Sequence, residues 1–136
     1  LKTTAVPGRF EEVLPNVFFD GAHNPASVHA LVQTVQTYYP NKRVEVILGM
    51  LKDKDVKEVL QVIEPIASKM QFIDIPNDRA LSAMEFYDLS NHHNKEIIQD
   101  ALSTIFAPVP VNTIRIVTGS LYLLADLRAK IKNLSK

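Results

Sequence analysis

A short polar segment from Asp20 to Asn24 directly follows an apolar run and places a carboxylate, a glycine and an imidazole close together. A carboxylate there can accept hydrogen bonds from a ribose, and an imidazole can donate one to a phosphate or a carboxylate. Asp20 and His23 are therefore candidate binding residues, and Gly21 could provide a backbone geometry that other residues resist. Asp-Gly is also a common turn sequence and Asn24 a typical helix N-cap, so a purely structural role is equally open.

Two further polar segments follow apolar runs, one at Gly119 and Ser120 and one at residues 49–55. A glycine and a hydroxyl at the start of a helix can supply N–H and O–H donors to an anion, although a capping role explains Ser120 nearly as well. The segment 49–55 alternates lysine with aspartate, which is more typical of a solvated loop with a helix cap than of a catalytic loop.

The histidines do not predict a metal site held by this chain alone. His29 lies six residues after His23, which is too far around a helix to share its face. His92 and His93 are neighbours, and adjacent helical residues do not converge on one ion. Cysteine is absent, which excludes disulfides, thiolate ligands and a cysteine nucleophile.

The elements that must position these residues follow an alternating pattern. Short β-type runs end in polar or turn residues and are followed by helical patterns, which is the signature of βα units and a parallel sheet. We therefore predict an α/β fold of Rossmann-like type, with a mostly parallel sheet, helices on both faces and one antiparallel edge strand. The predicted strands are 9–14 (the edge), 17–20, 44–49, 71–75 and 113–118, and the predicted helices are 25–39, one capped by Asp53 or Asp55, 84–89, 95–106 and one from Ser120 to Leu134.

Length and charge narrow the classes of function. The chain has 136 residues, equal numbers of acidic and basic side chains and a formal net charge of zero. That length predicts one domain, 1–136, and the charge balance disfavours partners such as nucleic acids or anionic membranes. No apolar stretch is long enough to span a bilayer, and the composition favours a cytosolic, cytoplasmic protein.

Several sequence motifs of self-sufficient enzymes are missing from the chain. It contains no Gly-x-Gly-x-x-Gly, no Gly-x-x-x-x-Gly-Lys-Ser/Thr and no Gly-x-Ser-x-Gly, which disfavours a complete dinucleotide enzyme, P-loop enzyme or α/β-hydrolase. The first residue is Leu1, so we expect the chain to be a piece of a longer protein. It is expected to contribute one half of a binding site.

The string Asp20-Gly21-Ala22-His23-Asn24-Pro25 resembles the hallmark of folylpolyglutamate and dihydrofolate synthases, in the C-terminal domain of the Mur ligase superfamily. Three more segments resemble motifs of that domain in the same order: residues 7–11, 49–55 and 119–123. Gly21 stands where the muramyl ligases commonly have tyrosine, which favours the folate branch. Val6 stands where the family often has tryptophan, a departure that affects aromatic packing near the nucleotide.

The resemblance implies an ATP-dependent ligase that activates a carboxyl group as an acyl phosphate and joins it to L-glutamate, with dihydropteroate or a folate as the other substrate. It implies that Arg9 contacts ATP phosphate and Asp20 the ribose or nearby nucleotide. It places His23 at the phosphate or the incoming glutamate, with a catalytic role, and Ser120 at the glutamate.

By the same resemblance, ATP and Mg²⁺ are bound mainly by a separate N-terminal P-loop domain, so the isolated chain is expected to be inactive. Two alternatives stay open on the residues alone. One is another Mur-type amino-acid ligase with a cell-wall or polymer substrate. The other is a stand-alone nucleotide-binding module without catalysis.

Overall fold

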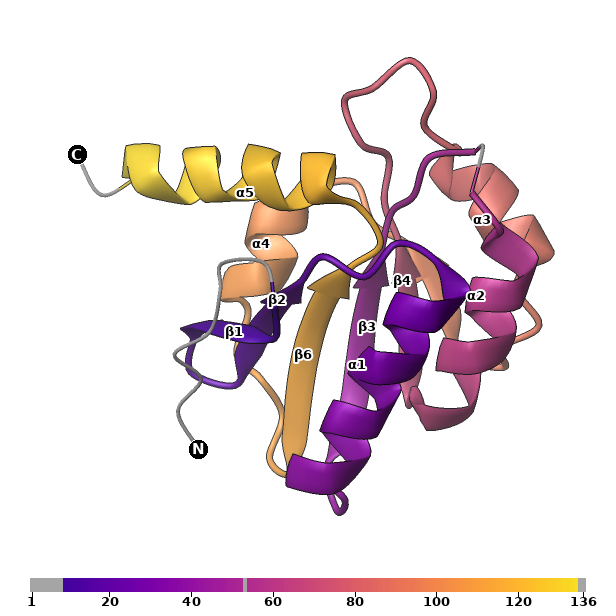
Figure 1. Cartoon of the computed structure of the whole chain (residues 1–136). Helices are drawn as coiled ribbons and strands as arrows, with labels where there is room; N and C mark the ends of the chain where they lie inside the picture. Colours follow the sequence, from indigo (N-terminus) through magenta and orange to yellow (C-terminus); the bar gives the residue numbers. More distant parts are fainter. Residues whose placement is uncertain (1–8, 53, 135–136) are drawn as a thin grey trace.

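The fold is built on one six-stranded sheet, seen in a computed structural model that describes residues 9–52 and 54–134 (Figure 1). The strand order is β1-β2-β6-β3-β4-β5, and every neighbouring pair is parallel except β1 with β2. The predicted fold class and antiparallel edge strand are thus confirmed. The strands are β1 (Glu11–Leu14), β2 (Val17–Asp20), β3 (Arg43–Leu48), β4 (Lys69–Phe72), β5 (Lys95–Ile97) and β6 (Thr113–Thr118).

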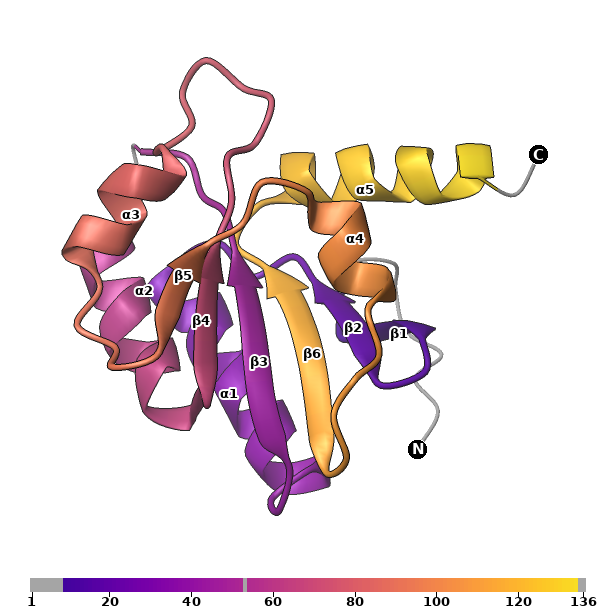
Figure 2. The same ribbon diagram turned by 180° about the vertical axis from the view of Figure 1, so that it is seen from behind.

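Helices cover both faces of the sheet, as predicted. Those on one face pack on a core cluster centred on β3, β4 and β6, and those on the other face pack on a second cluster beside β2 and β6 (Figures 1 and 2). No helix of the described ranges is long and apolar enough to cross a bilayer. The first face carries α1 (Pro25–Tyr38), α2 (Val56–Ile63) and α3 (Ala83–Leu89). α2 runs directly into a 3-10 turn at Glu64–Ile66. The second face carries α4 (Ala101–Phe106) and α5 (Leu121–Leu134).

The predicted helix 95–106 is wrong, because the segment divides into β5 and α4. Ile97 lies opposite Phe72 of β4 in parallel register. Asp100 then starts α4 by accepting the backbone N–H groups of Leu102 and Ser103 through Oδ1. The apolar residues have helical spacing, but pairing at the sheet edge overrides that pattern.

The predicted strand 71–75 is shifted in the structure. β4 begins at Lys69 and ends at Phe72. Beyond that end, the backbone N–H of Ile73 still donates to the carbonyl of Leu48 at 3.1 Å, and Ile75 stays buried. The apolar run therefore continues into the core after regular pairing has stopped.

Helix capping fixes where the site loops end. Asn24 caps α1 with its side chain and forms a reciprocal capping box with Ser27, and Pro25 occupies the first turn, as predicted. Asp55 lies at the N-cap position of α2 but makes no capping hydrogen bond through its side chain, so the predicted cap is not formed by this residue. Asp53, the other predicted cap, lies outside the described residues.

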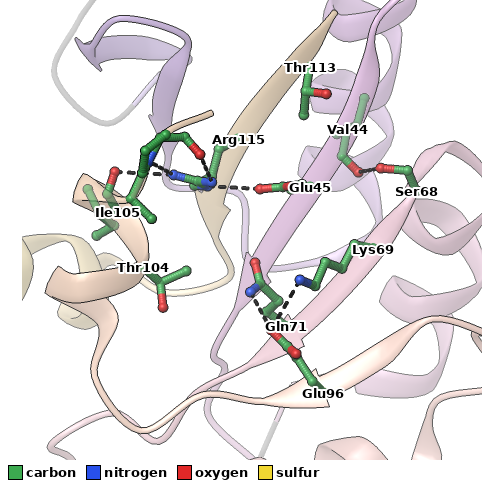
Figure 3. A network of polar contacts seen from close by, with 12 residues as sticks. Val44, Glu45, Ser68, Lys69, Gln71, Glu96, Thr104, Ile105, Thr113 and Arg115 are labelled. Atoms are coloured by element: carbon green, nitrogen blue, oxygen red, sulfur yellow. Dashed lines mark hydrogen bonds and ion pairs between the residues drawn. The ribbon is translucent and has the colours of Figure 1, made fainter. Parts of the chain in front are cut away.

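A polar network crosses the face of the sheet that carries α4 (Figure 3). Arg115 of β6 pairs with Glu45 of β3, and on the neighbouring strands Glu96 accepts from Gln71 at 2.7 Å and pairs with Lys69 at 3.4 Å. Arg115 also donates to the carbonyls of Ile105 and Ala107, and these bonds hold α4 and its connection to β6 against the strands. α5 packs on the same face of the sheet.

Candidate functional site

The site lies at the carboxyl ends of β2 and β6, which are adjacent parallel strands. The chain leaves β2 into α1 on one face and leaves β6 into α5 on the other (Figure 1). In open parallel sheets such a reversal leaves a crevice in which ligands bind. A hollow of about 650 Å³, the β2–β6 hollow, lies here and is lined by Arg9, Phe10, Asp20, Gly21, Ala22, His23, Ser27, Ala30, Leu31, Thr34 and Leu121.

The three polar segments found in the sequence meet at this edge of the sheet. The carbonyl of Ala22 accepts the N–H of Gly119 at 3.0 Å and the hydroxyl of Thr118 at 3.3 Å. The N–H of Gly49 donates to the carbonyl of Thr118 at 3.3 Å. The loops after β2, β3 and β6 therefore form one connected surface. The sequence alone placed each of these loops after a different strand and did not show that they are hydrogen-bonded to one another.

The glycine that the backbone requires is Gly119 rather than Gly21. Gly119 has a φ of +109°, and a Cβ at this position would lie 2.3 Å from the carbonyl oxygen of Gly49. Gly21 has no positive φ. The N–H of Gly119, one of the donors that the sequence offered for an anion, donates instead to the carbonyl of Ala22 in this structure.

Asp20 ends β2 and uses both carboxylate oxygens within the protein. Oδ1 accepts the N–H of Ala22 and Oδ2 accepts the N–H of Phe10, each at 2.9 Å. Burial raises the pKa of Asp20 above its usual value, while these two hydrogen bonds and the guanidinium of Arg9 act in the opposite direction. The side chain is thus a backbone anchor as well as a wall of the β2–β6 hollow.

Phe10 is a site residue that sequence reasoning missed. Its ring is buried and stacks on Phe18 of β2 at 4.4 Å between centroids, with 8° between the planes. Its φ of +40° is left-handed, which costs a non-glycine residue about 1–2 kcal/mol. Arg9, exposed and adjacent in the chain, lines the β2–β6 hollow together with Phe10. Only its place beside Arg9 could have drawn attention to Phe10.

His23 lies in the loop before α1 with a defined ring orientation. Its Nδ1 is 3.0 Å from the carbonyl of Gly21, and since a carbonyl only accepts, Nδ1 carries the proton in this contact. The neutral ring therefore presents Nε2 as an acceptor, and Nε2 donates only when the ring is protonated. Arg9, Asp20 and His23 are brought together at the β2–β6 hollow.

Ser120 performs the capping role that the sequence allowed. Its Oγ accepts the N–H groups of Tyr122 and Leu123 at 3.1 and 3.4 Å at the start of α5, and only 3% of the residue is exposed. Leu121, the next residue, lines the β2–β6 hollow, whereas Ser120 does not. A contact between Ser120 and glutamate stays a prediction.

One face of α1 forms a wall that sequence reasoning also missed. Ser27, Ala30, Leu31 and Thr34 all line the β2–β6 hollow. Their spacing of three and four residues places them on one side of the helix. The signal was present in the sequence, because small and polar residues at this spacing follow directly after the candidate loop.

The remaining candidates stand apart from the β2–β6 hollow. His92 is buried, with Nε2 2.8 Å from the carbonyl of Ala67 and Nδ1 accepting the N–H of Asn94, and its ring stacks on His93. Within residues 9–52 and 54–134, no group of three His, Asp or Glu side chains could hold a metal ion.

Comparison with known proteins identifies relatives over most of the chain. Residues 8–121 match the family described as Mur ligase, glutamate ligase domain. The chain is 36% identical to the dihydrofolate synthase/folylpolyglutamate synthase of Bacillus subtilis over 137 residues, which cover 97% of this chain and 32% of the relative.

Two solved structures share the fold. The folylpolyglutamate synthase of Mycobacterium tuberculosis complexed with ADP matches with a TM-score of 0.82 and 26% identity, covering 93% of this chain and 32% of that one. The Escherichia coli FolC protein in complex with ADP matches with a TM-score of 0.86 and 25% identity, covering 98% of this chain and 33% of that one. The chain therefore spans about a third of the length of the relatives it matches.

Proposed function

The chain belongs to the Mur ligase family of glutamate ligase domains, and from this premise we propose that it is the C-terminal domain of an ATP-dependent ligase that joins L-glutamate to dihydropteroate or to a folate. In such a reaction ATP phosphorylates a carboxyl group, and the amine of glutamate then displaces phosphate from the acyl phosphate to form an amide. Support for the substrates comes from the two activities named for the Bacillus subtilis relative.

The observation that carries this proposal is the meeting of Arg9, Asp20 and His23 at the β2–β6 hollow. The hollow lies at the strand reversal, where the N-termini of α1 and α5 flank the carboxyl edge (Figure 1). Its volume of about 650 Å³ and its cationic side chain suit the phosphates and ribose of a nucleotide. The two solved relatives complexed with ADP agree with this use.

Each side chain suits a separate part of the substrates. Arg9 can hold a phosphate with two parallel N–H donors. His23 can accept a proton at Nε2 from the incoming amine, or donate to a phosphate when protonated. Asp20 belongs to the nucleotide part of the site, and Ser120, at the start of α5, is assigned to the glutamate part.

The chain requires a second domain to complete this chemistry. Its described residues offer no cluster of three metal-ligating side chains. As the family resemblance implies, we assign Mg²⁺ and the P-loop contacts to an N-terminal domain. Closure of this chain over the nucleotide would position the phosphates and exclude water, which matters because an acyl phosphate is readily hydrolysed.

The test is a ligation assay on the full-length protein, made by joining this chain to its native upstream sequence. With ATP, labelled glutamate and either dihydropteroate or a reduced folate, we expect an amide product, and none from the 136-residue chain alone. Failure of the full-length protein with both acceptors would contradict the proposal. Transfer to a cell-wall precursor would instead identify another Mur-type ligase.

A calorimetric titration of the 136-residue chain with ATP is the second measurement. We expect weak or undetectable binding, because half of the proposed site is missing. Tight binding by the chain alone would contradict the divided site and favour a stand-alone nucleotide-binding module.

A further inference from the structure

Resting on that proposed function, we propose that Arg128 of α5 is a positioning residue for Arg9, acting through its ion pair with Glu11 of β1. The pair fixes the start of β1 against α5, and Arg9 lies two residues before Glu11 in the chain. Arg128 does not line the β2–β6 hollow, so it acts on ATP through Arg9 rather than by a contact of its own.

The ion pair is bidentate and joins two elements that are far apart in the sequence. Nη2 of Arg128 donates to Oε1 of Glu11 at 2.7 Å, and Nη1 donates to Oε2 at 3.3 Å, across 117 residues of sequence. Only 34% and 31% of the two side chains are exposed. Two parallel N–H donors on one carboxylate fix the direction of the contact as well as its length.

The same guanidinium lies over the ring of Phe19, with 5.3 Å between Cζ of Arg128 and the ring centroid. Phe19 of β2 is the residue opposite Glu11 in the antiparallel pairing of β1 with β2. Arg128 therefore contacts both members of one cross-strand pair. β1 is an edge strand of four residues whose register with β2 shifts between Glu12 and Leu14, so this attachment to α5 adds to a short and interrupted ladder.

Adjacent residues at the start of β1 are held from opposite faces of the sheet. Phe10 belongs to the core cluster on the face of α1, where its ring stacks on Phe18. Glu11 is held on the other face, where Phe19 packs in the same cluster as the apolar residues of α5. The stacked ring and the ion pair therefore restrain this part of the backbone from both sides.

Arg9 comes directly before these two restrained residues and lines the β2–β6 hollow. A guanidinium holds a phosphate through two parallel donors only when it is correctly oriented. A restrained backbone has less freedom to lose when ATP binds, so the same contacts give tighter binding. α5 can provide this restraint because it begins at Leu121, which lines the same hollow, and extends toward the side of the sheet where β1 lies (Figures 1 and 2).

The experiment is a double-mutant cycle in the full-length ligase, measured as kcat and as KM for ATP and for glutamate. Arg128→Met keeps an apolar chain over Phe19 and Glu11→Gln keeps the size of the acid, but each removes the ion pair. Each should raise KM for ATP about 2- to 5-fold, the range expected for a partly exposed ion pair. The double variant should be no worse than the single variants. An unchanged KM, or effects that multiply, would overturn the proposal.

Two comparisons separate the positioning of Arg9 from a general loss of structure. Neither single variant should raise KM for ATP further once Arg9 is alanine, because the side chain that the pair positions is then absent. KM for glutamate should keep its wild-type value, since a displaced α5 would disturb the sites of both substrates. A further rise in the Arg9→Ala background, or an equal rise in KM for glutamate, would show that the pair acts in another way.

Lys130→Met is the matched control on the same helix. Lys130 pairs with Asp126 at 3.0 Å, so this variant also removes a positive charge and an ion pair from α5, but neither residue lines the β2–β6 hollow. It should leave KM for ATP unchanged, and a rise equal to that of Arg128→Met would overturn the proposal. Glu11→Gln controls for charge in the other direction, because losing a negative charge would by itself favour the binding of ATP.

Hydrogen exchange separates this inference from the ligase function. In the full-length protein, the amides of residues 9–14 should exchange faster in Arg128→Met than in the wild type, and at the wild-type rate in Lys130→Met. Unchanged exchange in Arg128→Met would overturn the positioning role whether or not the ligase is active. An inactive wild-type ligase would contradict only the proposed function, and the exchange rates would then decide on Arg128.

Discussion

Arg115 of β6 donates through Nε to Glu45 of β3 at 2.9 Å, and only 4% and 13% of the two side chains are exposed (Figure 3). The same guanidinium donates through Nη1 to the carbonyl of Ala107 at 2.8 Å and so binds the connection between α4 and β6. The pair therefore joins β3, β6 and the connection from α4 on the face of the sheet where α4 and α5 pack.

Removing Arg115 should be among the most damaging single changes to stability. Arg115→Met leaves the Glu45 carboxylate without its partner in the sheet and the carbonyl of Ala107 without its donor, so we expect a loss of about 3–5 kcal/mol in the free energy of unfolding. Urea denaturation measures it. The double variant with Glu45→Met should lose less than the two single variants combined, and strict additivity would show that the two side chains are not energetically coupled.

The close approach of Gly119 to the carbonyl oxygen of Gly49 predicts a second effect on stability. Gly119→Ala places a Cβ 2.3 Å from the carbonyl oxygen of Gly49 at a φ of +109°, so it should destabilise the fold by more than about 1 kcal/mol. Thermal unfolding provides the measurement. Gly21→Ala is the matched control because Gly21 has no positive φ, and equal losses from both variants would contradict this account.

The parts of the fold that could be predicted from sequence depend on local signals. The alternation of strands and helices, and the cap formed by Asn24, are encoded in neighbouring residues. The division of 95–106 into β5 and α4 was missed because its apolar spacing also fits a helix, and only pairing with β4 decides between the two. Arg115 and Glu45 left a usable signal, since each is a charge inside an apolar run.

The site was predictable in its loops but not in its contacts. Parallel strands bring their carboxyl ends to one edge, so Asp20 and His23 could be placed together with the loop that Gly119 begins. The hydrogen bond from Phe10 to Asp20 could not be foreseen, because it depends on a left-handed aromatic residue that no local propensity favours.

The titration of Asp20 gives a prediction for pH. Burial raises its pKa in the folded state, so the native protein takes up this proton at a higher pH than the unfolded chain does. Its contribution to stability therefore increases as the pH falls from neutral through the folded pKa, and decreases as the pH rises. NMR titration of the carboxyl carbon should give a pKa above 3.8. Asp20→Asn should remove this pH-dependent contribution to stability. A pKa of Asp20 at its ordinary value would contradict the prediction.

Asp100 should behave in the opposite way. Its hydrogen bonds with the side chain and then the backbone of Ser103 lower its pKa below the ordinary 3.8. Its stabilising contribution is fully present above that ordinary value and is lost as the pH falls through the lower folded pKa. Asp100→Asn can still cap α4, so it should weaken this acid-dependent loss while leaving helix content at neutral pH unchanged. Circular dichroism at neutral pH and at a pH below the folded pKa of Asp100 measures the helix content of both proteins. An identical loss of helix in acid for Asp100→Asn and the wild-type protein would contradict the assignment.

His23 offers the most direct test of chemistry at the β2–β6 hollow. Its ring donates from Nδ1 to Gly21, and Nε2 is the atom left for a substrate. In the full-length ligase, His23→Ala should lower kcat/KM for glutamate about 10- to 100-fold, as expected for one lost hydrogen bond to a charged group. The melting temperature should change little, because the side chain lies on a loop rather than in the core. His29→Ala, an exposed change on α1 away from the hollow, is the control and should keep full activity. If His23→Ala instead unfolds the domain, or keeps wild-type turnover, the residue has a structural role in the loop and the chemistry lies elsewhere.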